Sequence, residues 1–115
     1  MALADLDFAY LTTVGRKSGR PRTIEIWFAL DGDTVYLLSG GGDSAHWVRN
    51  LQANRQAKVR LGRKTYSGTA RFVEGQPEDR TARRMLAAKY EAWEPGKRLS
   101  SWARNSLLVA IDVSR

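Results

Sequence analysis

The chain has no cysteine among its 115 residues and only one histidine, His46. Without cysteine there can be no disulfide, thiolate metal ligand, iron–sulfur cluster or cysteine nucleophile. A single histidine is also too few for the usual zinc sites, which combine several nitrogen or sulfur ligands. We therefore expect no metal site in this protein.

Long hydrophobic runs are missing as well. No stretch approaches the about 18 consecutive apolar residues that a membrane span requires. The first five residues, MALAD, lack both the basic and the apolar region of an export signal. Because both features are missing, we expect no membrane-spanning helix and no export. We therefore expect a cytoplasmic protein.

The composition is typical of one globular domain, residues 1–115. Apolar residues make up 43% of the chain and charged residues 27%, and the charges are interspersed rather than blocked, which argues against disorder. The formal net charge of +7 indicates an anionic partner: nucleic acid, an acidic membrane surface or a phosphorylated small molecule. Charge alone does not choose among these three.

The pattern of apolar and turn residues predicts a mainly β protein with some helix. Strands are expected at 8–13, 23–30, 34–39, 57–61, 65–73 and 106–113. A short helix should follow the glycines at 40–42 and end near Asn54, and a longer one should run from Pro77 to before Pro95. About six strands joined by short turns favour a small antiparallel barrel or a strongly curled sheet, because closure removes exposed edges.

The stretch TTVGRKSGRPR, residues 12–22, places four cations around two glycines. It is not a nucleotide-binding P-loop, because no glycine stands at position 11 and Arg16 precedes Lys17 and Ser18. The backbone N–H groups at 17–19, the Ser18 hydroxyl and the nearby cations could converge on a phosphate or carboxylate. The alternative is a solvated basic hairpin without a ligand.

A second candidate is the segment SGGGDSAHWVRNL, residues 39–51. Its glycines allow a ligand to approach the backbone, and the helix that follows offers a positive N-terminus to an anion. His46 could supply a proton near neutral pH. The alternative is a flexible connection in which Trp47 and Leu51 are ordinary core residues and His46 lies at the surface.

The C-terminal third mixes basic residues with Tyr90, Trp93 and Trp102. Aromatic rings among cations are one way in which small barrels hold single-stranded nucleic acid. No aromatic RNA-binding signature is present, however, and an amphipathic helix with a solvated outer face explains the same pattern. We therefore expect no nucleic-acid partner. A basic barrel that binds nucleic acid is kept as the least favoured hypothesis for the function.

Three blocks of the sequence resemble consecutive signature blocks of the deazaflavin (F420)-dependent nitroreductase family: LTTVGRKSGRPR, YLLSGGG and HWVRNLQAN. This family belongs to the flavin/deazaflavin oxidoreductases of split β-barrel type. The closing segment KYEAW…WARNSLLVAIDV is also similar to that family. The resemblance covers residues from about Leu11 to Val113. It implies a mainly β split barrel that binds F420 and works as an F420H2-dependent reductase.

The resemblance also implies roles for individual residues. The phosphate end of F420 would be held by Arg16, Lys17, Ser18, Gly19 and Arg22. The ring and linker would be lined by Ile24, Glu25, Leu38, Ser39, Gly40 and Gly41, with His46, Trp47 and Asn50 closing the pocket from the short helix. The implied reaction is hydride transfer from C5 of reduced F420 to an electron-poor acceptor such as a quinone, nitroaromatic or enone. The catalytic candidates for the accompanying proton are His46, Tyr90 and water.

Departures from the family pattern leave alternatives open. Glu25, Ala45 and Arg55 stand where many relatives carry proline. An acidic residue beside the ring would disfavour a reduced anionic deazaflavin, and FMN is the natural substitute in this fold. A non-enzymatic carrier of a cofactor or tetrapyrrole on the same barrel is the second alternative for function. The superfamily further implies a homodimer and allows loose contact with an acidic membrane surface, where a lipid quinone would be met.

Overall fold

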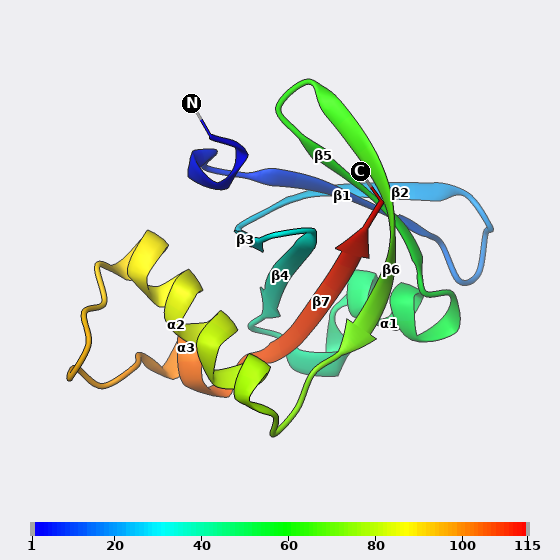
Figure 1. Cartoon of the computed structure of the whole chain (residues 1–115). Helices are drawn as coiled ribbons and strands as arrows, with labels where there is room; N and C mark the ends of the chain where they lie inside the picture. Colours follow the sequence, from blue (N-terminus) through cyan, green and yellow to red (C-terminus); the bar gives the residue numbers. More distant parts are fainter. Residues whose placement is uncertain (1, 115) are drawn as a thin grey trace.

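The computed structural model describes residues 2–114, which form seven strands, three α-helices and two short 3-10 turns (Figure 1). The strands are β1 (Ala9–Val14), β2 (Pro21–Ile26), β3 (Ala29–Asp31), β4 (Thr34–Ser39), β5 (Gln56–Leu61), β6 (Lys64–Phe72) and β7 (Leu107–Val113). The helices are α1 (His46–Ala53), α2 (Pro77–Glu91) and α3 (Ser101–Asn105), and the 3-10 turns are η1 (Leu3–Asp5) and η2 (Gly42–Ser44). None of these helices is long and apolar enough to cross a membrane.

The strands of the described chain pair antiparallel in one sheet of order β2-β1-β5-β6-β7-β4-β3. The two edge strands, β2 and β3, are consecutive in the chain and joined only by Trp27 and Phe28. Because two linking residues can bridge only about 10 Å, the opposite edges of the sheet must meet at this link. The sheet is therefore curled into a barrel that is open elsewhere, which confirms the predicted split β-barrel (Figure 1).

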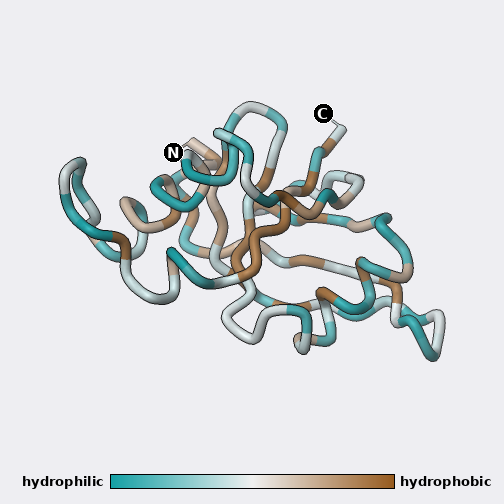
Figure 2. Tube along the Cα trace, turned by 90° about the horizontal axis from the view of Figure 1, so that it is seen from below, coloured by the Kyte–Doolittle hydropathy of each residue, from teal (hydrophilic) through white to brown (hydrophobic). Residues whose placement is uncertain are grey.

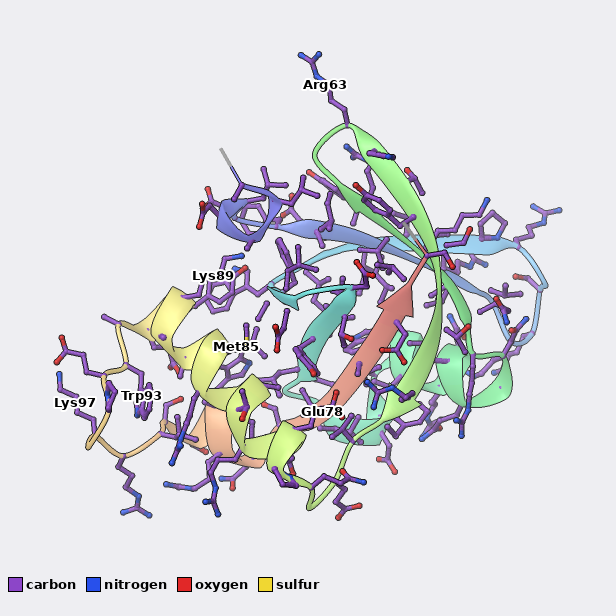
Figure 3. The ribbon with its side chains drawn as sticks, viewed as in Figure 1. Arg63, Glu78, Met85, Lys89, Trp93 and Lys97 are labelled. Atoms are coloured by element: carbon purple, nitrogen blue, oxygen red, sulfur yellow. The ribbon has the colours of Figure 1, made fainter. Side chains whose placement is uncertain are left out.

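The segment 23–30, predicted as one strand, forms parts of two. At Trp27 and Phe28 the chain leaves β1 and crosses to β4. The end of α2 holds the backbone of Phe28, whose N–H donates to Tyr90 Oη at 3.0 Å and whose carbonyl accepts from Lys89 Nζ at 3.1 Å. These side chains satisfy backbone groups that have left the sheet. Figure 3 shows Lys89 at the end of α2 nearest β3.

The hydrophobic core has two parts, one on each face of β4 and β7. Inside the curl, Leu11, Leu37 and Ile111 belong to one buried cluster, and under α2, Leu38 and Leu86 belong to the other. Strands buried on both faces read as continuous apolar runs rather than alternating ones, which explains the TVYLLS and LLVAIDV sequences. In Figure 2 the hydrophobic segments gather in the middle of the trace and the hydrophilic ones in the outer loops.

The helices differ from the prediction at two points. The residues expected to cap the short helix, Asp43 and Ser44, lie in η2, and α1 begins after Ala45 without a side-chain cap. A third helix, α3, was not predicted; the Ser100 hydroxyl caps it by accepting a hydrogen bond from the N–H of Ala103 at 3.1 Å. The longer helix begins at Pro77 as expected, because proline has no N–H to leave unsatisfied in the first turn.

Candidate functional site

A groove of about 600 Å³ opens between the free edge of β2, the basic turn at residues 15–20 and the start of α1. Its lining residues are Thr13, Gly15, Arg16, Lys17, Ser18, Pro21, Arg22, Thr23, Ile24, His46, Trp47 and Asn50. Side chains from two distant stretches of sequence, 13–24 and 46–50, therefore share one surface. The groove lies where the barrel is split, because β2 pairs with β1 on one side only.

The basic turn has a fixed shape of its own. The N–H of Gly15 donates to the carbonyl of Arg20, and the N–H of Gly19 donates to the carbonyl of Gly15, both at 2.8 Å. Gly19 has a φ of 72°, a left-handed conformation that glycine adopts without strain. The Ser18 hydroxyl accepts a hydrogen bond from the N–H of Arg20 at 3.1 Å. The turn thus presents its cations from a hydrogen-bonded loop rather than from a loose one.

Asn50 ties this turn to α1. It is only 4% exposed, and its Nδ2 donates to the Thr13 hydroxyl at 3.1 Å. Its Oδ1 accepts from the backbone N–H of Arg16 at 3.2 Å and from the Arg16 guanidinium at 2.9 Å. Both the oxygen and the nitrogen of this amide are therefore engaged with the protein itself, and the side chain fixes the position of Arg16.

His46 meets the same guanidinium. Arg16 Nη2 lies 3.2 Å from His46 Nδ1. Because arginine only donates hydrogen bonds, Nδ1 must be the acceptor, which places the imidazole proton on Nε2. His46 is also the first residue of α1, whose first turn has no side-chain cap. Uncapped N–H groups at a helix start bind anions readily.

The charge of the groove is of one sign. Its lining holds the cations Arg16, Lys17 and Arg22 and no carboxylate. Among residues 2–114, every ion pair lies elsewhere, on Arg71, Arg83 or Lys97. The same part of the chain has no group of three or more acidic or histidine side chains that could hold a metal ion. The groove can therefore bind an anionic organic ligand, with Ile24 and Trp47 supplying apolar contact.

Residues 1–105 match the family described as F420H2-dependent quinone reductase. The chain belongs to this family. A curated member, an F420H2-dependent quinone reductase from Mycobacterium tuberculosis, is 40% identical over 72 residues, which are 60% of this chain and 47% of that protein. The chain therefore spans about half the length of the curated relatives it matches.

Solved structures agree with this assignment. An F420H2-dependent reductase is 25% identical and superposes with a TM-score of 0.71, covering 91% of this chain and 93% of that one. Another structure, described as a domain-swapped dimer, has the same identity and TM-score and covers 91% of this chain and 79% of that one. Both share the split-barrel fold.

The structure brings together eight of the residues that the family resemblance pointed to. Arg16, Lys17, Ser18, Arg22, Ile24, His46, Trp47 and Asn50 all line the groove. Thr13, Gly15, Pro21 and Thr23 line it as well but were not singled out. All four lie in or beside the LTTVGRKSGRPR block, so proximity to the strongest family motif was the signal that could have found them.

Glu25, by contrast, does not line the groove. It pairs across the sheet with Tyr10, and its carboxylate accepts a hydrogen bond from the Tyr10 hydroxyl at 3.0 Å on the exposed face. Ile24 pairs with buried Leu11 on the inner face. Because successive residues of a strand point to opposite faces, Ile24 and Glu25 cannot share one wall. This alternation was the signal in the sequence that could have separated them.

The remaining candidates also lie outside the groove. Gly19 lines a second hollow of about 300 Å³ that also includes Lys58. Leu38 is buried under α2, and the Ser39 hydroxyl donates to the carbonyl of Gly42 at 2.8 Å. Gly40 and Gly41 follow β4 at the surface. The roles implied for these residues stay predictions.

Tyr90 lies at the far end of α2. Its hydroxyl accepts from the N–H of Phe28 and lies 2.8 Å from the carbonyl of Asp7, to which it can donate. Burial raises the pKa of Tyr90. A phenol that is engaged in this way holds its proton firmly. Tyr90 does not line the groove, and the catalytic role implied for it stays a prediction.

Proposed function

We propose that this protein binds F420 in the groove and uses the reduced cofactor to reduce an electron-poor acceptor, of which a quinone is the first candidate. The observation that carries the proposal is the lining, which has cations on the basic turn and at the start of β2, apolar Ile24 and Trp47, and no carboxylate. An elongated ligand with an anionic end and a flat ring fits such a lining. Membership of the F420H2-dependent quinone reductase family supports the same assignment.

The groove residues divide into three roles in this proposal. Lys17 and Arg22 bind the phosphate end of the cofactor, and Asn50 keeps Arg16 at the same end. Ile24 and Trp47 pack against the ring. When bound, reduced F420 supplies the hydride. Because Arg16 already occupies the Nδ1 lone pair of His46, we assign His46 a hydrogen-bond donor role through Nε2 and assign the proton to water.

Glu25 bears on the choice between F420 and FMN. The argument for FMN placed an acidic residue beside the ring. With the Glu25 carboxylate bonded to Tyr10 on the exposed face, that argument loses its basis. We therefore assign F420 as the cofactor.

A side-by-side titration tests this function. Purified cofactor-free protein is titrated with F420 and with FMN at moderate salt, followed by calorimetry, and the F420H2-loaded protein is then mixed with a quinone, a nitroaromatic and an enone. We expect F420 to bind more tightly than FMN and at least one acceptor to oxidise F420H2. A preference for FMN, or binding of neither, would contradict the proposal.

We also propose that the protein forms a homodimer. The domain-swapped dimer with 25% identity supports this assignment, as do the two free sheet edges, β2 and β3, which can pair with another chain. Light scattering coupled to size-exclusion chromatography should give twice the mass of the chain. A monomer over a wide concentration range would contradict this assignment, and it would leave the F420 proposal standing.

A further inference from the structure

Thr13 places a buried hydroxyl in an otherwise apolar row of the barrel interior. Successive residues of a strand point to opposite faces, so Thr13 of β1 follows Ala9 and Leu11 on the inner face, and all three are buried. Its neighbour in β5 is the small, buried Ala57. A buried hydroxyl destabilises a fold unless it is hydrogen-bonded. Valine would fill the same space without that requirement, so packing alone does not explain a hydroxyl at this position.

The partner of this hydroxyl is the buried side-chain amide of Asn50. Asn50 Oδ1 faces two groups of Arg16 that can only donate, the backbone N–H at 3.2 Å and the guanidinium at 2.9 Å. The amide oxygen must therefore point toward Arg16, and the amide NH2 group toward Thr13. Thr13 Oγ1, at 3.1 Å, is the acceptor that this orientation requires. The hydroxyl thus supports one of the two orientations of the amide.

The oriented amide in turn places the guanidinium of Arg16 in the groove wall. Nη1 donates to Asn50 Oδ1, and Nη2 lies 3.2 Å from His46 Nδ1. Both partners are neutral acceptors, and within residues 2–114 no carboxylate forms an ion pair with Arg16. The guanidinium therefore keeps its charge for an anionic ligand. Because it is already held, it also loses less side-chain entropy when that ligand binds.

We propose, on the basis of the function proposed above, that Thr13 is a positioning residue for the phosphate end of the cofactor. It acts through Asn50, which places Arg16 where a phosphate can accept from the guanidinium. Without the hydroxyl, the buried NH2 group of Asn50 lacks an acceptor, and leaving a buried donor unsatisfied is unfavourable. The amide then turns toward another acceptor, and its oxygen leaves Arg16. Loss of the hydroxyl thus reaches the ligand through the guanidinium.

The test is a double-mutant cycle of Thr13→Val and Arg16→Met, with F420 as the ligand and calorimetry as the measurement. Valine has the shape of threonine without its hydroxyl. We expect Thr13→Val to weaken F420 binding about tenfold in the parent protein, which corresponds to one hydrogen bond to a charged group. In Arg16→Met protein, where no guanidinium is left to place, the same change should weaken binding by less than about twofold. Equal losses in the two backgrounds would mean that the hydroxyl acts directly or through the fold, and would overturn the proposal.

Thr34→Val is the matched control. Thr34 also lies in a strand, its hydroxyl donates to Asp112 Oδ1 at 3.0 Å, and it does not line the groove. F420 affinity in Thr34→Val should equal that of the parent protein, and urea unfolding of both valine variants compares their stability. Thr13→Ser, which keeps the hydroxyl, should recover most of the affinity lost in Thr13→Val. A serine variant that binds as weakly as the valine variant would assign the loss to packing and overturn the proposal.

A measurement without ligand tests the positioning directly, and it does not depend on how well Thr13→Val folds. Nitrogen NMR resolves the Nη–H groups of an arginine whose guanidinium is held by hydrogen bonds, whereas free rotation averages them. We expect resolved Arg16 signals in the parent and Thr13→Ser proteins, and averaged signals in folded Thr13→Val. Averaged Arg16 signals in the parent protein would overturn the proposal.

A phosphate titration separates this inference from the cofactor assignment. Inorganic phosphate is added, and the backbone NMR signals of residues 16–19 are followed. If F420 fails to bind but phosphate binds the turn more weakly in Thr13→Val than in the parent protein, the positioning role stands and the cofactor assignment falls. If F420 binds the parent and Thr13→Val proteins equally, the cofactor assignment stands and the positioning role falls. Binding of neither ligand to the parent protein would overturn both.

Discussion

Lys17 and Arg22 carry charges that no carboxylate within residues 2–114 neutralises by an ion pair. Exposed cations of this kind contribute little to folding, because water solvates them in the folded and the unfolded chain alike. Their neighbours are arranged differently: Arg16 is held by Asn50 and His46. One cation held by the protein and two cations without an ion pair, on the basic turn and the adjoining start of β2, are the arrangement expected of a site for an anionic group.

Charge reversal tests the role of these cations. We expect Lys17→Glu combined with Arg22→Glu to weaken F420 binding about a hundredfold or more, because two charge-assisted hydrogen bonds are replaced by repulsion. The free energy of unfolding should change by less than about 1 kcal/mol. Calorimetric titration with F420 and urea unfolding of the same samples give both quantities.

The matched control for this pair is Arg63→Glu combined with Arg98→Glu. It changes the net charge by the same amount, and Arg63 projects from the tip of the β5–β6 hairpin, far from the groove (Figure 3). F420 affinity in the control should stay close to that of the parent protein. Equal loss of affinity in the two pairs would show a general effect of net charge and would contradict the assignment of Lys17 and Arg22 to the phosphate.

At the scale of elements, α2 is anchored to the sheet by a charged network at its first turn. Glu78 accepts hydrogen bonds from Arg71 at 2.8 and 2.9 Å and from the Tyr36 hydroxyl at 2.5 Å. Arg71 also pairs with Asp112 of β7. The bonds from Arg71, followed by the bond from Tyr36, lower the pKa of Glu78 from 4.5 to about 2. Burial, with the nearby Glu78 carboxylate, raises the pKa of Tyr36.

This network predicts an acid-sensitive helix. A carboxylate whose pKa is lowered by folding stabilises the protein above its unfolded pKa and loses that contribution as the pH falls through its folded pKa. Part of the stability should therefore disappear between about pH 5 and pH 2. Glu78→Gln should lower the free energy of unfolding at pH 7 by about 1 to 2 kcal/mol and should flatten this acid dependence.

Thermal unfolding from pH 2 to pH 7 measures both effects. Glu74→Gln is the matched control, because Glu74 is exposed, lies just before α2 and forms no ion pair within the described residues. Its pH profile should follow that of the parent protein. An acid transition in Glu78→Gln that is as steep as in the parent protein would contradict the assigned role of Glu78.

At the scale of the whole molecule, the curl of the sheet depends on a close approach between β6 and β7. Gly68 of β6 pairs with Val113, and a Cβ on Gly68 would lie 2.6 Å from Ile111 Cγ2 and 2.9 Å from the carbonyl oxygen of Asp112. Real Cβ atoms do not approach other atoms so closely, so an added methyl group must push the two strands apart. Glycine at this position thus allows the barrel to tighten.

Gly68→Ala tests this point. We expect it to lower the free energy of unfolding by about 1 to 3 kcal/mol, the usual cost of overpacking. Gly41→Ala is the comparison, because a Cβ there would meet nothing closer than 3.9 Å. Urea unfolding with a midpoint unchanged in Gly68→Ala would mean that the strands accommodate the methyl group freely and that the close approach does not shape the barrel.

The sequence by itself determined the features that rest on local chemistry. The turn residues and the alternation of apolar side chains predicted most strands and the short turns between them. The block around Arg16 and the segment leading to Trp47 predicted two parts of the site. These signals are local because turn geometry and side-chain alternation depend on a few neighbouring residues. The resemblance carried by the same blocks predicted the family.

Only the tertiary structure decided which of these features meet. It divided segment 23–30 into two strands at Trp27 and Phe28 and placed Glu25 on the outer face. It also bonded Tyr90 to Phe28 away from the groove and stacked its ring on Trp27. Each outcome depends on where the two edges of the sheet come together, and that is fixed by packing between residues far apart in the chain. The individual motif residues could be identified from the sequence. The groove itself exists only because the curl of the sheet brings β2 beside α1.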